Sequence, residues 1–262
     1  MESRTKLFLV LWLAGMAGVL SFLFVDLSEL IAQMPIPAGK EVPVVTPALK
    51  LLSLVQPAVI LSIAVLAGTA LASKVGLRSP VAEAIAGAGP AWPALQSQIA
   101  PGLWGGLAGG LAIVLTQLLW IPFLPPEVMA RSAALAKLLP LVTRLLYGGI
   151  TEELLLRWGL MTLLVWAAWR VFQRRQGAPK PVCFAGAILI SSVVFGLGHL
   201  PLAFLFFPNA TAGLIANVIV VNSLFGLVAG YLYWKKGLES AVVAHMGAHI
   251  VMLAASSLGL LS

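Results

Sequence analysis

The stretch LFLVLWLAGMAGVLSFLFV occupies residues 7–25 and contains no charged side chain. A helix that crosses a bilayer needs about 20 mostly apolar residues, so this stretch is long enough to span a membrane. Six further apolar stretches follow, at residues 51–72, 103–123, 138–169, 182–199, 212–234 and 241–261. The sequence therefore predicts an all-α, polytopic transmembrane helical bundle of about seven spans. Residues 202–207 are apolar but too short to span alone, and fit either a re-entrant piece or part of an eighth span.

The composition excludes several other classes of protein. Of the 262 residues, 60% are hydrophobic and 10% are charged, whereas a soluble domain is about half apolar and about a quarter charged. A water-soluble monomer and a disordered chain are therefore excluded. Cys183 is the single cysteine, so there is no intramolecular disulfide. The net charge of +7 does not indicate a nucleic-acid partner, because no basic stripe with interleaved aromatic residues is present.

The distribution of charge predicts the orientation in the membrane. Cytoplasmic loops of membrane proteins carry an excess of Lys and Arg. With seven spans, four basic clusters fall on one face: Arg4 and Lys6; Lys74 and Arg78; Arg170, Arg174, Arg175 and Lys180; Lys235 and Lys236. The other face carries Asp26, Glu29, Glu41 and Glu127. We expect a multi-pass protein of the plasma (inner) membrane with a cytoplasmic N-terminus and the lipid bilayer as its surroundings.

The sequence predicts one membrane domain over residues 1–262. Residues 33–46 and 78–101 are rich in Pro, Ala and Gly and are expected to be connections. The fourth span is long, and an interruption is expected near Gly148 and Gly149. The third span contains four glycines, which permit close helix packing: Gly105, Gly106, Gly109 and Gly110.

Two adjacent carboxylates lie inside the fourth span, in Glu152-Glu153-Leu-Leu-Leu-Arg157. An ionisable group in the hydrocarbon region costs about 2.5 to 3.5 kcal/mol, and such groups usually face a bundle interior or a cavity. Glu153 and Arg157 are four residues apart and share a helix face, so they can neutralise each other. Glu152 points elsewhere and lacks a local partner, which suits a general base. A purely structural Glu–Arg bridge explains Glu153 well and Glu152 poorly.

All three histidines lie in or at the ends of apolar segments. His199 closes the motif Phe195-Gly196-Leu-Gly198-His199, in which the glycines let another helix or a substrate backbone approach. His245 and His249 are four residues apart on one helix face, and two imidazoles so placed are metal ligands or paired donors into one cavity. Interhelical hydrogen bonds and a histidine at the membrane interface are the structural alternatives.

Together, the three clusters resemble the CPBP family, which contains the CAAX prenyl endopeptidases and their bacterial relatives, often labelled Abi proteins. The resemblance rests on three motifs: Glu-Glu-x-x-x-Arg, Phe-x-x-x-His and a late helix that begins with His. The approach from Phe225-Gly226 to His245 also looks like the family. The resemblance covers residues 145–255, the core that carries the motifs.

This resemblance implies an intramembrane endopeptidase that hydrolyses peptide bonds of membrane-associated peptides or proteins. By position, Glu152 and His199 would activate the attacking water and His245 would stabilise the oxyanion. Glu153 and Arg157 would be structural or tuning partners. The family usually has Asn where this chain has His249, which would then be a further catalytic donor.

The sequence leaves two questions open. In the preferred interpretation no cofactor is required; in the alternative, zinc is bound by Glu152, His199, His245 and His249. The alternative functions are an inactive family member acting as an immunity or scaffold protein, and a proton-coupled transporter that titrates Glu152. The first three spans contain almost no ionisable groups, which argues against transport.

Depth along straight helices does not bring the three motifs to one level. At 1.5 Å per residue, Glu152 lies about 27 Å from Arg170 and His199 about 28 Å from Lys180, whereas His245 lies only about 14 Å from Lys236. Helix tilt, a re-entrant segment or a missed span would be needed.

Overall fold

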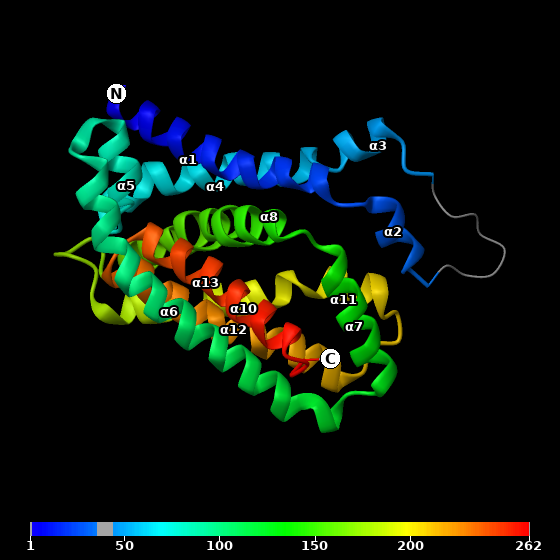
Figure 1. Cartoon of the computed structure of the whole chain (residues 1–262). Coiled ribbons are helices and arrows are strands. Elements are labelled where there is room, and N and C mark those ends of the chain that lie inside the picture. Colours follow the sequence, from blue (N-terminus) through cyan, green and yellow to red (C-terminus); the bar gives the residue numbers. More distant parts are fainter. Residues whose placement is uncertain (1, 36–43, 262) are drawn as a thin grey trace.

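The computed structural model describes residues 2–35 and 44–261, so Glu41 lies outside the described residues. The described chain is helical and contains no strand (Figure 1). Its first half contains α1 Glu2–Ser21, η1 Phe22–Phe24, α2 Leu27–Ala32, α3 Pro47–Leu52, α4 Val55–Leu71, η2 Ala72–Val75, α5 Pro80–Glu83, η3 Ala84–Ala88, α6 Ala91–Trp120 and η4 Ile121–Phe123. Its second half contains α7 Pro126–Leu138, α8 Leu141–Thr143, η5 Arg144–Glu152, η6 Leu154–Met161, α9 Thr162–Phe172, α10 Pro181–Gly198, α11 Leu200–Phe206, α12 Ala212–Lys235 and α13 Leu238–Ser257.

Within the described ranges, seven helical segments are long and apolar enough to cross a membrane, so the chain is a multi-pass membrane protein. They are Glu2–Phe24, Pro47–Val75, Ala91–Phe123, Leu141–Phe172, Pro181–Phe206, Ala212–Lys235 and Leu238–Ser257. The all-α bundle of about seven spans is thus confirmed. The short apolar piece after His199 is α11, which extends the fifth span, so an eighth span is not needed.

The connection expected at residues 78–101 is shorter than the sequence suggested. Helix α6 already begins at Ala91 and contains Pro101 in its interior. Pro93 falls in the first turn of α6, where its missing N–H would have had no helical partner. Proline content alone therefore misplaced the start of the third span by about ten residues.

The fourth span is not interrupted at Gly148 and Gly149. It continues from Leu141 to Phe172 and is wound as π-helix over Arg144–Glu152 and Leu154–Met161. A β-carbon on Gly148 would lie 2.5 Å from His249 Nε2, and one on Gly149 would lie 2.5 Å from Met246 Cγ. The glycines therefore bring this helix close to α13 rather than breaking it.

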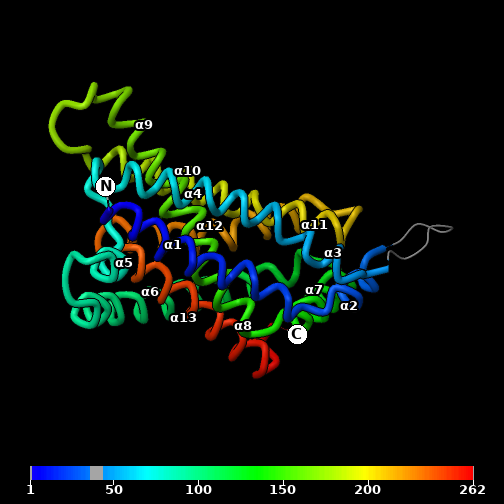
Figure 2. The backbone as a smooth tube through the Cα atoms, turned by 90° about the horizontal axis from the view of Figure 1, so that it is seen from above, coloured from blue at the N-terminus to red at the C-terminus, as the bar shows by residue number. Residues whose placement is uncertain are grey.

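The axes of the long helices extend between two ends of the bundle (Figures 1 and 2). One end holds the N-terminus, and the other holds α2 and α3. The first of these ends carries the four basic clusters and is called the basic end below. In Figure 1, α6 and α13 run obliquely to α1 and α4. This tilt means that distance along α13 is a poor measure of depth in the bundle.

Helix α13, which carries two of the three histidines, packs along α6. Gly106 and Gly247 face each other, since a β-carbon on Gly247 would lie 3.3 Å from the Cα of Gly106. Small residues allow two helix backbones to approach in this way, so the expected role of the glycines in the third span is confirmed. Gly110 lies against α13 in the same manner, beside Val251.

The start of α13 is fixed at the basic end. Gly237 has a φ of +141°, which L side chains rarely adopt, and turns the chain out of α12. Glu239 Oε1 then accepts hydrogen bonds from Ser79 Oγ at 2.6 Å and from the backbone N–H groups of Val81 and Ala82. These bonds cap α5 and fix the axial position of His245, which lies two turns further along α13.

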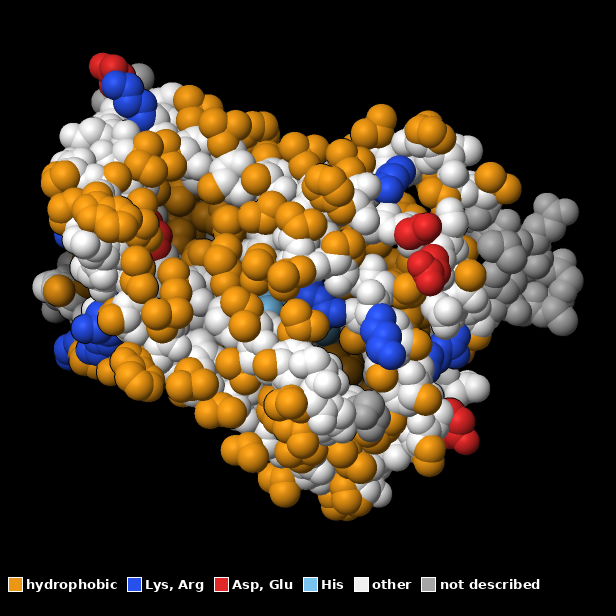
Figure 3. Space-filling model, in the orientation of Figure 1, with side chains coloured by type: hydrophobic (Ala, Val, Ile, Leu, Met, Phe, Trp, Pro, Cys, Tyr) orange, Lys and Arg blue, Asp and Glu red, His pale blue; other side chains and the backbone are white. Residues whose placement is uncertain are grey.

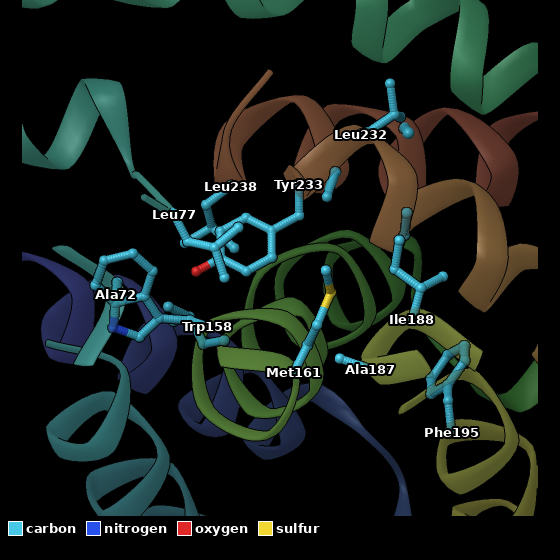
Figure 4. Close-up of a cluster of buried hydrophobic side chains, with 14 of the residues drawn as sticks. Ala72, Leu77, Trp158, Met161, Ala187, Ile188, Phe195, Leu232, Tyr233 and Leu238 are labelled. Atoms are coloured by element: carbon cyan, nitrogen blue, oxygen red, sulfur yellow. The ribbon is translucent and has the colours of Figure 1, made fainter. Parts of the chain in front are cut away.

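The interior and the outer surface are both apolar, as expected for a chain surrounded by lipid. Trp158 and Met161 of η6 meet Tyr233 of α12 and Leu238 of α13 in the core (Figure 4). Hydrophobic side chains also cover much of the outer face (Figure 3). Several of them are more than half exposed, among them Leu13, Ile63, Trp104, Leu119 and Val182.

Candidate active site

The three polar motifs come from three different spans. Glu152 and Arg157 lie in the two π-helical stretches of the fourth span, and Glu153 lies between these stretches. His199 lies at the junction of α10 and α11, and His245 and His249 lie on α13. Figure 3 shows histidine at the floor of a hollow in the surface, with basic side chains beside it.

Arg157 and Glu153 form the ion pair that their spacing predicts. Arg157 Nε lies 3.2 Å from Glu153 Oε2, and both side chains are 0% exposed. Arg157 Nη2 also donates to the carbonyl oxygen of Gly226 on α12 at 3.0 Å. The guanidinium lies 5.1 Å from the ring centroid of Phe195 on α10. Arg157 therefore joins the fourth span to both α10 and α12.

Glu153 has a second partner that the sequence did not indicate. Its Oε1 accepts a hydrogen bond from His245 Nδ1 at 2.8 Å. With Nδ1 donating, the neutral imidazole directs the lone pair of Nε2 to the opposite side. Glu153 thus orients His245 in the way that a buried carboxylate orients a catalytic imidazole.

Glu152 lies beyond that imidazole, at the edge of the cluster. Its Oε2 is 3.8 Å from His245 Nε2, and its side chain is 19% exposed. Of the four groups, Glu152 alone keeps appreciable exposure, as expected for a carboxylate without a local partner. Arg157 and the two ionised carboxylates together carry a net charge of −1. Adding one proton, to Glu152 or to His245, makes the cluster neutral, which a low-dielectric site favours.

His199 makes its closest polar contact within its own helix. Its Nδ1 donates to the carbonyl oxygen of Phe195 at 2.8 Å, which leaves Nε2 free to accept a proton in the neutral ring. In the described part of the chain no hydrogen bond joins His199 to Glu152. The Phe195 ring lies between the motifs, with edge-to-face contacts to His199 at 4.9 Å and to His245 at 5.8 Å between centroids.

His249 is stacked on His245, with ring centroids 5.0 Å apart and planes inclined by 11°. Both of its nitrogens are buried and have no hydrogen-bond partner within the described residues. Buried polar atoms are usually hydrogen-bonded in folded proteins, so the ring nitrogens of His249 differ from those of His245 and His199, each of which has one such bond.

These contacts answer the question that the estimate of depth left open, since the tilt of α13 brings His245 to the other motifs. His245 is hydrogen-bonded to Glu153 and touches the Phe195 ring, so all three motifs lie at one level. The estimate assumed straight, upright helices, whereas α13 is oblique. The sequence placed Phe225 only in the approach to the last motif and gave it no role at the site, whereas its ring lies 4.4 Å from that of His245.

Comparison with known proteins agrees with these motifs. Residues 134–251 match a family model described as type II CAAX prenyl endopeptidase, Rce1-like. Over these residues, a little under half of the chain, the protein is similar to the CAAX-protease-like family. The matched stretch contains all six candidate residues, and the expected resemblance over residues 145–255 is confirmed. Comparison with curated proteins and with solved structures gives no match. The family is one of proteases.

The two histidines of α13 do not lie as they would if they shared one zinc ion. A metal bound by two imidazoles must lie in the plane of both rings, but the planes of His245 and His249 are nearly parallel and stacked. Among residues 2–35 and 44–261, no group of three or more His, Cys, Asp and Glu is arranged to hold a metal ion.

The two glycines of the CAAX-protease-like motif before His199 differ in their surroundings. A β-carbon on Gly196 would lie 2.5 Å from the carbonyl oxygen of Ile219 on α12, whereas one on Gly198 would have no atom within 4 Å. We expect Gly196→Ala to destabilise the protein by about 1 to 3 kcal/mol, since neither backbone can yield easily. Gly198→Ala should leave the melting temperature nearly unchanged.

Thermal unfolding of both variants in detergent tests this difference. Equal melting temperatures would contradict the packing of α10 on α12. If Gly198→Ala folds normally but loses activity, the open space beside Gly198 is the place where a substrate backbone approaches the site.

Proposed function

We propose that the chain is an intramembrane endopeptidase that hydrolyses peptide bonds of membrane-associated peptides or proteins. The observation that carries the proposal is the continuous series of contacts Arg157–Glu153–His245–Glu152, buried between three helices. A structural ion pair needs only the first two groups. The oriented imidazole and the partly exposed second carboxylate are what hydrolysis requires.

In the proposed reaction Glu152 is the general base. It takes a proton from a water molecule, whose oxygen attacks the carbonyl carbon of the scissile peptide bond. The C–O bond forms and the carbonyl oxygen becomes an oxyanion. The C–N bond then breaks, and the proton held by Glu152 passes to the leaving amine. His199 would hold the same water through its free Nε2.

His245 and His249 would stabilise the oxyanion. With Glu153 accepting from Nδ1, a protonated His245 can donate through Nε2 to the negative oxygen, while Glu153 balances its charge. His249 offers unpaired ring nitrogens beside it. This assignment makes Glu153 and Arg157 positioning residues, and it uses no metal.

Replacing His249 by asparagine tests whether the reaction is independent of metal. We expect His249→Asn to keep most of the activity, because an amide N–H can reach the oxyanion by a similar path. If zinc were bound through the histidines, the same change would remove a nitrogen ligand and abolish both metal content and activity. The measurement is elemental analysis together with cleavage in the presence and absence of a chelator. Stoichiometric zinc that is lost with activity would contradict the proposal.

The proposed location is the plasma (inner) membrane with a cytoplasmic N-terminus. Its support is that the four basic clusters lie at one end of the bundle, as cytoplasmic loops require. A cysteine at the N-terminus, labelled from one side of sealed vesicles, would test this orientation.

Cleavage by the purified protein tests the function itself. The full chain is reconstituted in liposomes with membrane-anchored reporter peptides, with and without a prenylated cysteine, and new termini are identified by mass spectrometry. We expect product from the parent and none from Glu152→Gln. Product formed equally by both would overturn the assignment. No product from the parent, while Glu152→Gln retains the biological activity of the parent, would favour a scaffold or immunity role.

A further inference from the structure

A second site lies at the basic end, away from the histidines. A cavity of about 360 Å³ lies between α1, the end of α4 with η2, and η6. Its polar lining consists of Arg4, Thr69, Ser73, Arg78 and Glu83, and its apolar lining of Leu7, Ala72, Gly76, Leu77 and Trp158. This volume is within the range of about 300 to 1,000 Å³ that small-molecule sites occupy.

The cavity is lined by hydrogen-bonding groups that lack partners. Trp158 is 1% exposed, and its Nε1–H has no acceptor within the described residues. The indole extends towards Ala72, as Figure 4 shows. Thr69 Oγ1 is likewise buried without a partner. Buried donors are nearly always satisfied in folded proteins, so these two indicate a ligand that accepts hydrogen bonds.

The charge of the cavity selects an anion. Arg78 is paired with Glu83, since its Nε and Nη2 donate to Glu83 Oε2 at 3.0 and 2.8 Å. The guanidinium of Arg4 makes no ion pair or hydrogen bond with the rest of the described chain. One positive charge therefore remains uncompensated at the mouth of the cavity.

The position of the cavity indicates that the anionic ligand is a lipid. It lies where the candidate spans Glu2–Phe24 and Pro47–Val75 reach the basic end, at the level expected for phospholipid headgroups. Leu7 and Leu77 supply an apolar wall next to the cationic mouth. We propose that this cavity binds the phosphate of an anionic phospholipid, with Arg4 pairing with the phosphate and Thr69 and Trp158 donating hydrogen bonds to the headgroup.

Occupancy should stabilise the helix that carries the acidic motif. Trp158 follows Arg157 directly, so a lipid held by the indole contacts the same turn that holds the Glu153 ion pair. A ligand that binds only the folded protein raises its melting temperature, and the stabilisation grows with the logarithm of the ligand concentration divided by its Kd. The proposal does not depend on catalysis and can be tested on an inactive variant.

The test is a lipid titration of the delipidated full chain in detergent, followed by melting temperature and by native mass spectrometry. Phosphatidylglycerol is compared with phosphatidylcholine and with inorganic phosphate. The variants are Arg4→Gln, Thr69→Val and the control Lys74→Gln, which removes an exposed charge of the same end that does not line the cavity.

We expect phosphatidylglycerol alone to raise the melting temperature and to remain bound in the mass spectrum. Arg4→Gln should weaken binding about fivefold, the effect of one cation at a membrane surface, and Thr69→Val should weaken it while preserving the fold. Equal weakening by Lys74→Gln would show a diffuse surface effect and overturn the site. Equal stabilisation by inorganic phosphate would replace the lipid by a free anion, and equal binding of phosphatidylcholine would remove the requirement for an anionic lipid.

Discussion

Replacing Glu152 by glutamine should lower the rate of peptide cleavage by about 10²- to 10⁴-fold, the usual contribution of a positioned general base. Glutamine keeps the size of the side chain but removes both its negative charge and its ability to accept a proton. Because Glu152 is 3.8 Å from His245 and makes no hydrogen bond in the described structure, the fold should be unaffected. His199→Ala should also abolish cleavage if its Nε2 holds the attacking water.

Reconstituted parent and variants, assayed at equal amounts of folded protein, provide the measurement. Equal melting temperatures for parent and Glu152→Gln are the control that separates chemistry from folding. A rate within about threefold of the parent would remove Glu152 from the reaction, because so small a change is well below the effect of losing a general base. In that case the partly exposed carboxylate would be a structural neighbour of His245.

Replacing Arg157 by alanine should cost about 3 to 5 kcal/mol of unfolding free energy, because it leaves the Glu153 carboxylate buried without its cation. The guanidinium also donates to Gly226 and lies on Phe195, so three helices lose a common contact. Glu152→Ala removes a group with no hydrogen bond and should be far milder. Arg157→Ala should therefore express poorly and melt well below Glu152→Ala.

Detergent-extracted yield and melting temperature of the two variants check this order. The double variant Arg157→Ala with Glu153→Ala is a further control, since it removes the stranded charge along with its partner. Recovery of part of the lost stability would support desolvation of Glu153 as the cause. Comparable stability of Arg157→Ala and Glu152→Ala would contradict the different roles given to the two sites.

Local patterns in the sequence predicted those features that depend on local spacing. Apolar run lengths give the seven spans, and the four-residue separation of Glu153 and Arg157 gives their ion pair. Ionisable groups inside apolar spans gave the candidate residues, and the family resemblance gave their expected roles, before any of them was located in space. Each motif consists of residues that are close in the chain.

The features that were missed depend on how distant helices cross. The hydrogen bond from His245 to Glu153 joins residues 92 positions apart, and nothing local in either motif selects Glu153 over Glu152. The π-helical winding of the fourth span was read as a break because glycine marks both a break and a close contact. The depth of His245 was left open because helix tilt is set by packing against α6, which the sequence of a single helix does not encode.

The backbone contact between Gly106 and Gly247 makes the first half of the chain a contributor to the site. Residues 134–251 match the family model and contain all three polar motifs, yet α6, which supports the histidine helix, lies outside them. A chimera that joins these residues to another set of leading helices would keep the reacting groups but could change their spacing. The N-terminal half thus offers a route by which the selectivity of such a protein can diverge while its chemical groups stay the same.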